Sequence, residues 1–228
     1  MLVHLRGDVW QIECTGVNAY LADDDGALTL IDTGMGRDGG TIRAAIREAG
    51  YDVRDLDRIL ITHYDVDHVG SLASLAAETD ADVYMGAADA PFLMGKEQPP
   101  GLTLKGFIQR AGKLLIDRPD HDPTLVADGD EIGSFTAYHT PGHTPGHTAY
   151  VSDALDAAFV GDLVFESDGE LDPSPWFITY DTESVRESIH ELADRAPAVD
   201  VLGMGHGTPF VRDGSIRLAE LGERIEQQ

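Results

Sequence analysis

The segment 63–68 concentrates side chains that can bind metal ions. His63, Asp65 and Asp67 alternate, so an extended chain would point all three side chains to one side. His68 follows directly, where we expect a helix to begin. Imidazoles and carboxylates are the ligands of zinc, iron and manganese. The segment therefore offers four ligands, two for each of two neighbouring metal ions.

Three further polar clusters follow predicted strands. His143 lies in a histidine-rich run, Asp162 follows the strand 157–160, and His206 stands between two glycines after the strand 198–202. Glycine beside a ligand lets the backbone turn sharply and approach the site closely. The clusters thus place imidazole and carboxylate groups at strand-to-loop junctions.

The order of these clusters resembles the metallo-β-lactamase superfamily. The resemblance rests on Ile31-Asp32-Thr33-Gly34, the His63–His68 cluster, Thr140-Pro141-Gly142-His143-Thr144, Gly161-Asp162 and Gly205-His206-Gly207. It covers nearly the whole chain, and the combination is far more specific than any one piece. It implies an α+β fold, a four-layer αββα sandwich with the metals at one edge of two sheets. The compact size and the Thr-Pro-Gly-His-Thr run are similar to the small hydroxyacylglutathione hydrolase-like branch.

The resemblance also implies a cofactor of one or two divalent metal ions, with zinc favoured. Carried over by position, the first metal takes His63 and His143, the second takes Asp67, His68 and His206, and Asp162 bridges them. A water or hydroxide between the metals would be the nucleophile. Asp67 would be a catalytic residue that orients this water.

Asp65 departs from the family pattern, which is usually His-x-His-x-Asp-His. If Asp65 binds a metal, the site contains three carboxylates. With two divalent ions the net charge of the site is then +1, or zero when hydroxide is also bound. We expect a weaker Lewis acid, a higher pKa of the bound water, and a gain of manganese or iron over zinc. The alternative hypothesis is that Asp65 reaches the metal only through water or supports its ligands.

Other polar residues near the clusters have expected supporting roles. We expect Asp32 to support the metal loops, and His139 and His147 to hydrogen-bond locally rather than bind metal. Tyr64 faces the substrate in one interpretation and is structural in the other.

The elements that must position the clusters are short strands and helices. Turn-forming Gly and Asp residues separate strands expected at Leu2–Leu5, Val9–Glu13, Asn18–Leu21 and Ala27–Ile31. Later strands are expected at 58–61, 134–138, 148–151, 157–160 and 198–202, and helices at 41–49, 69–76, 183–193 and from 215. This order predicts helices packed outside two sheets, in a single domain over 1–228.

The segment 91–118 is expected to be an inserted, lid-like helical segment. Its apolar residues recur at helical spacing from Leu104 to Leu115. It holds every lysine of the chain and a net charge of +3, so the rest carries −28. One hypothesis is a lid whose basic face meets an anionic small-molecule substrate. The other is a helix that complements the acidic body or a second subunit, which would make a homodimer.

The overall charge argues against nucleic acid as a partner. Forty-one acidic residues face sixteen basic ones, for a net charge of −25. With three lysines against thirteen arginines, this balance is typical of a halophilic protein, whose medium has a very short screening length. The alternative is simply an acidic protein.

The sequence also allows predictions about cellular location and disulfide bonds. No apolar run approaches the roughly 20 residues of a membrane helix, and the start, 1–8, is too short and polar for a secretory signal. The single Cys14 excludes an intrachain disulfide. A cytoplasmic protein without membrane contact is expected.

The function expected from these residues is hydrolysis by a metal-activated water. Candidate substrates are an ester, thioester, lactone or phosphoester, with acyl substrates favoured. A nuclease is disfavoured because no additional RNA-binding arm is evident. The rival hypotheses are an iron-dependent oxidoreductase of the same fold and a non-catalytic metal-binding member.

Overall fold

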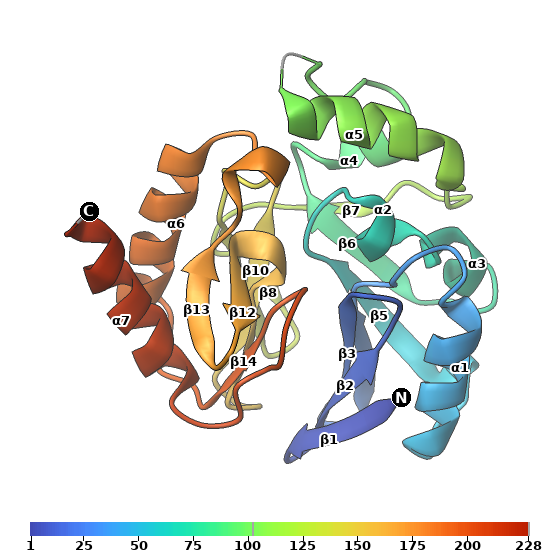
Figure 1. Cartoon of the computed structure of the whole chain (residues 1–228). Helices are drawn as coiled ribbons and strands as arrows, with labels where there is room; N and C mark the ends of the chain where they lie inside the picture. Colours follow the sequence, from blue (N-terminus) through green and yellow to red (C-terminus); the bar gives the residue numbers. More distant parts are fainter. Residues whose placement is uncertain (102, 228) are drawn as a thin grey trace.

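Two sheets face one another, with helices on the outer side of each (Figure 1). The structure is a computed structural model that describes residues 1–101 and 103–227. The first sheet runs in chain order through β1 Leu2–Arg6, β2 Val9–Glu13, β3 Asn18–Asp24, β4 Ala27–Ile31, β5 Leu56–Ile61, β6 Asp82–Gly86 and β7 Thr124–Val126. Its strands are antiparallel up to β4 and parallel from β4 to β7. Parallel pairs need crossovers, which helices α1 Gly39–Glu48, α2 Val66–Val69 and α3 Leu72–Ala76 help to provide.

The second sheet has the strand order β14-β11-β10-β9-β8. Its strands are β8 Glu131–Ile132, β9 Phe135–His139, β10 Thr148–Ser152, β11 Ala157–Phe159 and β14 Val201–Gly203. A separate hairpin pairs β12 Val164–Ser167 with β13 Glu170–Pro173. Helices α6 Thr182–Arg195 and α7 Gly214–Glu226 cover the outer face of this sheet (Figure 1).

Three apolar layers hold the four layers of elements together. Between the sheets, Tyr20 and Leu60 pack with Phe135, Tyr150 and Phe159. A second cluster joins the first sheet to its helices, and a third joins the second sheet to α6 and α7. Because both faces of each sheet are covered, strands such as β5 end in continuous apolar runs. The predicted αββα sandwich is confirmed.

The helix after His63 differs from the sequence prediction. It begins at Val66 rather than near Val69, and Gly70 separates α2 from α3. A Cβ at Gly70 would collide with the backbone of Met35 and Gly36, so close packing requires glycine there. Asp67 is therefore helical, and the expectation of one extended run from His63 to Asp67 was wrong.

The segment 91–118 is helical, but its apolar face points outward. It contains most of α4 Ala90–Leu93, α5 Leu104–Gly112 and the 3-10 turn η2 Lys113–Leu115. Lys105 and Gln109 are buried, whereas Leu104 is 55% and Phe107 68% exposed. Figure 1 shows α5 lying across one end of the first sheet. The polar face of α5 thus packs on the protein, and the reason lies in the residues beneath it.

Within the described part of the chain, no helix has the length and apolar character needed to cross a membrane.

Candidate metal centre

The four sequence clusters meet at one edge of the two sheets. The loop after β5 brings His63 and Asp65, α2 brings Asp67 and His68, and the loop between β9 and β10 brings His143. Asp162 lies in the 3-10 turn η3 Gly161–Leu163 after β11, and His206 in the loop after β14. Residues separated by more than 140 positions therefore share one site because these strands end side by side.

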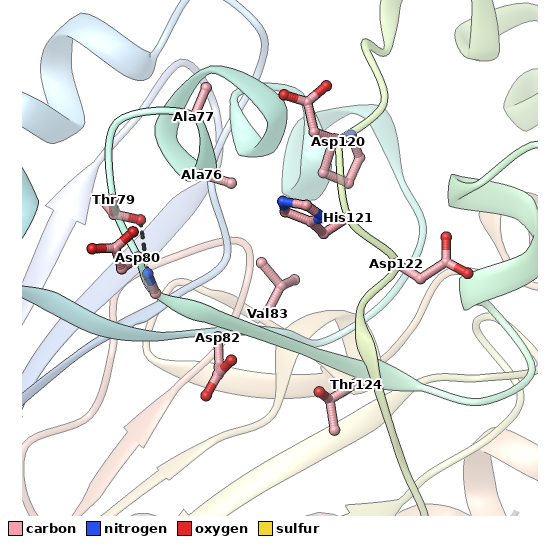
Figure 2. A pocket seen from close by; sticks show the side chains of 12 residues that line it. Ala76, Ala77, Thr79, Asp80, Asp82, Val83, Asp120, His121, Asp122 and Thr124 are labelled. Carbon is pink, nitrogen blue, oxygen red and sulfur yellow. Dashed lines mark hydrogen bonds between the residues drawn. The ribbon is translucent and has the colours of Figure 1, made fainter.

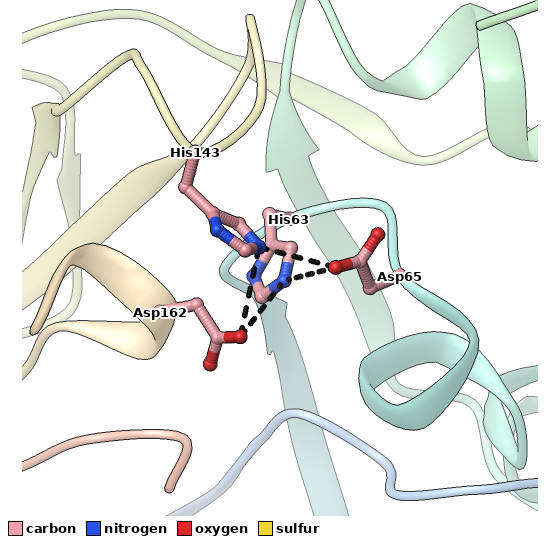
Figure 3. Close-up of side chains that lie close together, drawn as sticks. All are labelled: His63, Asp65, His143 and Asp162. Carbon is pink, nitrogen blue, oxygen red and sulfur yellow. Dashed lines mark hydrogen bonds and ion pairs between the residues drawn. The ribbon is translucent and has the colours of Figure 1, made fainter. Parts of the chain in front are cut away.

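The first ligand group consists of His63, Asp65, His143 and Asp162, drawn in Figure 3. One ligand atom from each lies within 4.8 Å of the others. The Nε2 atoms of His63 and His143 lie 3.3 and 3.1 Å from Asp65 Oδ2. They lie 4.0 and 3.5 Å from Asp162 Oδ2. Asp65 therefore faces the same point as the two histidines.

The second group consists of Asp67, His68 and His206, again with ligand atoms within 4.8 Å. His206 Nε2 is 3.5 Å from Asp67 Oδ2 and 3.3 Å from Asp162 Oδ2. His68 Nε2 is 3.2 Å from Asp162 Oδ1. Asp162 thus lies between the groups, and the grouping matches the ligand set that the family resemblance implies.

The donor atoms fit a metal ion. Among the described residues, four buried side-chain atoms have no hydrogen-bond partner, and three of them belong to the cluster: His63 Nε2, His68 Nε2 and Asp162 Oδ1. Burying such atoms without partners is costly. All three point into the cluster, where divalent ions held by the two ligand groups would satisfy them.

Each of the four histidines is bonded through Nδ1 and presents Nε2 to the cluster. The Nδ1 partners are Thr62 Oγ1 for His63, Asp32 Oδ2 for His68, Ser174 Oγ for His143 and the Gly16 carbonyl for His206. A carbonyl or carboxylate only accepts, so Nδ1 of His68 and of His206 carries a proton, and Nε2 of each ring is directed into the cluster. Such outer contacts fix the tautomer of metal-binding histidines.

Asp32 joins two of these histidines. It accepts from His68 Nδ1 and from the hydroxyl of Thr62, each within 2.8 Å, and Thr62 Oγ1 in turn contacts His63 Nδ1. The residue is 3% exposed and has a left-handed backbone with φ of 59°. This arrangement gives Asp32 the supporting position that the sequence predicts for it.

Three other residues that the sequence analysis considered, His147, His139 and Tyr64, lie outside the ligand groups. His147 contacts Thr140 Oγ1 through Nδ1, and its Nε2 accepts from the backbone N–H of Asp162 at 3.2 Å, so no lone pair remains for a metal. His139 bonds the carbonyl of Pro145. Tyr64 is 1% exposed and its ring packs near Phe92, but it also belongs to the wall of the pocket beside Asp65, so both interpretations of this residue stay open.

Asp89 is a supporting residue that the sequence analysis missed. This buried carboxylate accepts from Tyr64 N at 2.8 Å, Thr144 Oγ1 at 2.6 Å and Gly146 N at 2.7 Å. It thereby ties the loop that carries His63 to the loop that carries His143. No local pattern marks Asp89, because it lies 25 or more positions from all three donors.

The electrostatics of the cluster favour ionised carboxylates. Burial alone would raise the pKa of Asp162, but His68, His206 and His143 outweigh it and hold this pKa well below its usual value. Burial alone would lower the pKa of His68, but Asp162 and Asp32 outweigh it and raise this pKa well above the usual range. The histidines and carboxylates of the cluster therefore stabilise one another's charged forms.

Lys105 of α5 enters the first ligand group. Its ammonium forms an ion pair with Asp65 Oδ2 and donates to His143 Nε2 at 2.7 Å. Against the effect of burial, Lys105, His143 and His63 hold the pKa of Asp65 well below its usual value. Burial and Lys105 together lower the pKa of His143 to about 3.

Gln109, one turn further along α5, also contacts Asp65. It donates to Asp65 Oδ1 at 2.7 Å and accepts from the hydroxyl of Tyr180 at 2.7 Å. The net charge expected for the metal centre from the sequence did not include the lysine of this helix. With Lys105 included, the excess negative charge of Asp65 is cancelled. The only signal in the sequence was the restriction of lysine to segment 91–118.

A pocket of about 300 Å³ opens beside both ligand groups. Asp65, Asp67, Asp162, His206, Lys105 and Gln109 contribute its polar lining. Apolar lining comes from Met35, Val66, Ile108, Ile116, Phe165 and Ile178. A larger cavity of about 400 Å³, with several aspartates around His121, lies elsewhere, between α3, β6 and the chain before β7 (Figure 2). None of the metal-centre residues lines that cavity, so the chemistry belongs to the smaller pocket.

An αββα sandwich with paired imidazole–carboxylate groups at one sheet edge defines a metal-binding protein of the metallo-β-lactamase type. The sequence profile of the metallo-beta-lactamase superfamily matches residues 12–206, and the chain belongs to that superfamily. Proteins of this fold bind divalent metal ions. The superfamily predicted from the motifs is confirmed.

Relatives match over most of their length. The uncharacterized protein YobT of Bacillus subtilis (strain 168) is 32% identical, covering 96% of each chain. The probable metallo-hydrolase YflN of the same organism is 29% identical, covering 90% of this chain and 85% of its own. Among solved structures, TTHA1623 in a di-iron-bound form has a TM-score of 0.69 at 27% identity, covering 91% of this chain and 92% of its own.

Proposed function

We propose that this protein is a metal-dependent hydrolase of a small acyl substrate: an ester, a thioester or a lactone. The observation that supports this proposal is the pairing of two ligand groups that share Asp162 and face one pocket. When bound, the metals polarise the substrate carbonyl and lower the pKa of the attacking water. Zinc is the favoured metal, because each ligand group supplies two imidazoles together with carboxylate oxygens.

The residues of the chain have distinct roles in this proposal. His63, Asp65, His143 and Asp162 would hold the first ion, and Asp67, His68 and His206 would hold the second, with Asp162 beside both groups. The Asp67 side chain is 24% exposed and lines the pocket, so its carboxylate orients the water and receives its proton. Asp32 and Ser174 keep Nε2 of His68 and His143 directed inward.

The pocket wall favours an acyl group over a phosphodiester. Its apolar side chains suit a hydrocarbon portion of the substrate. The charge of −25 opposes a polyanion such as nucleic acid. An anionic substrate would have to compete with Asp65 for Lys105, because that ammonium is already paired.

A substrate panel tests this function directly. Zinc- and manganese-loaded protein in high salt is offered p-nitrophenyl esters, a thioester, a lactone and bis-p-nitrophenyl phosphate. We expect turnover of an acyl substrate that chelation removes and that His206→Ala abolishes. His139→Ala, which deletes an imidazole outside the ligand groups, is the matched control. A metal-loaded protein inert toward the whole panel would identify a non-catalytic member instead.

An iron-dependent oxidoreductase is the second candidate. Asp65 adds a carboxylate to the first group, and carboxylates suit iron better than an imidazole-only set does. The di-iron form of TTHA1623 supports iron as a metal that this architecture accepts. Protein purified without chelator from its native host would then contain iron and show a visible absorption band. Colourless, iron-free protein with acyl hydrolase activity would exclude this candidate.

A further inference from the structure

The position of Lys105 within the first ligand group is the feature that the proposed function does not use. Its side chain is 3% exposed, although lysine is rarely buried without a partner. The ammonium contacts Asp65 Oδ2 and His143 Nε2, which are two of the four ligand atoms of that group. A cation supplied by the chain therefore lies where the first metal would bind.

Lys105 and a first metal ion cannot bind His143 at the same time, because its Nε2 atom has a single lone pair. Lysine only donates, so His143 Nε2 accepts from Lys105 while Nδ1 contacts Ser174 Oγ. A metal bound by His143 would need that same Nε2 lone pair. Asp65 Oδ2 is shared in the same way. Lys105 and a first metal thus compete for both atoms.

We propose that the Lys105 ammonium is an internal counter-cation of the first metal subsite, so that a metal enters this subsite only when Lys105 leaves it. The second subsite, formed by Asp67, His68 and His206, has no contact with Lys105 among the described residues and fills first. The inference depends on metal binding by these residues but not on hydrolysis.

Departure of Lys105 requires a shift of α5. Gln109 on the same face donates to Asp65 Oδ1 and is bonded to Tyr180, so the helix is attached to the site at two positions one turn apart. The outward face of α5 is apolar and exposed, with Leu104 and Phe107 more than half accessible. Few contacts on that side oppose a movement of the helix away from the pocket.

The first experiment counts metals. Chelator-treated protein in high salt is titrated with zinc by calorimetry, and retained metal is measured by elemental analysis after desalting. We expect one tightly held zinc in the wild type and a second that binds at least about tenfold more weakly. Lys105→Met should bind the second zinc at least about tenfold more tightly than the wild type. Lys96→Met removes an exposed lysine of the same segment and should behave as the wild type. Equal second affinities in Lys105→Met and wild type would overturn the proposal.

The second experiment uses wild-type protein, so it does not depend on the folding of a variant. The chain has only Lys96, Lys105 and Lys113, so reductive methylation followed by mass spectrometry reports each lysine separately. Lys105 should be protected with one zinc bound and become reactive with the second, while Lys96 and Lys113 stay constant. Two bound metals with Lys105 still protected, or one metal with Lys105 already reactive, would refute the competition. A wild type that binds no metal would refute the metal centre itself.

Discussion

The ion pair between Asp65 and Lys105 makes a stability prediction that needs no metal and no substrate. In chelator-treated protein, Asp65→Asn removes the charge but keeps the shape and the hydrogen-bonding capacity toward Gln109 and the histidines. The pair is nearly buried, with side chains 13% and 3% exposed. The variant therefore leaves the Lys105 ammonium buried with no carboxylate beside it.

The expected cost follows from that burial. Removing one partner of a buried pair destabilises a protein by about 3–5 kcal/mol, because the remaining charge is uncompensated. For a chain of this size, 1 kcal/mol shifts the melting temperature by about 2–4 °C, so Asp65→Asn should melt about 6–20 °C lower. Replacing both partners, in Asp65→Asn with Lys105→Met, should recover most of the loss because no charge is then stranded.

A double-mutant cycle by urea unfolding in high salt measures this coupling. The exposed pair Lys96–Asp122, with side chains 61% and 57% exposed, is the matched control. Asp122→Asn should cost no more than about 1 kcal/mol. If Asp65→Asn costs no more than Asp122→Asn, or if the two single effects simply add in the double variant, the buried pair does not form in solution.

Three further predictions concern the ligands, their support and the surface. His68→Ala or His206→Ala should remove the metal of the second subsite and abolish hydrolysis, whereas His147→Ala should retain most of the metal. Elemental analysis checks both results, and equal metal loss in His147→Ala would contradict the ligand assignment. Asp89→Ala leaves three buried hydrogen-bond donors without an acceptor. Each unsatisfied donor costs about 1–3 kcal/mol, so the variant should lower the free energy of unfolding by at least about 3 kcal/mol. Asp89→Ala should also weaken metal binding by about 10–100-fold, as measured by zinc titration. An unchanged zinc affinity would show that Asp89 does not position the loops that carry His63 and His143. If the acidic composition reflects a halophilic protein, the melting temperature should rise steeply from 0.1 to 3 M KCl, because the screening length falls from about 10 Å to about 3 Å or less. A flat profile would remove that interpretation.

The parts of the fold that local chemistry specifies could be predicted from the sequence. The bounds of β2 and β4 agree with prediction because turn-forming residues fix the ends of these strands. The hairpin β12–β13 and the strands β6 and β7 were missed, since they are short and some have exposed, polar positions that carry no strong apolar pattern. The start of α2 was placed late because its first turn consists of site residues, whose polarity conceals the helical pattern.

The sequence by itself was enough to recognise the superfamily and to predict the seven residues that the structure brings together, because motifs at strand ends are local features of the sequence. Only the tertiary structure decided what surrounds Asp65. Lys105 is 40 positions away, and the sequence left open whether the basic face of segment 91–118 meets the substrate, the acidic body or a second subunit. The structure turns this polar face toward Asp65, because a buried carboxylate and ammonium stabilise each other where neither is tolerated alone. Such a pairing depends on where two elements pack, and no local pattern in the sequence specifies it.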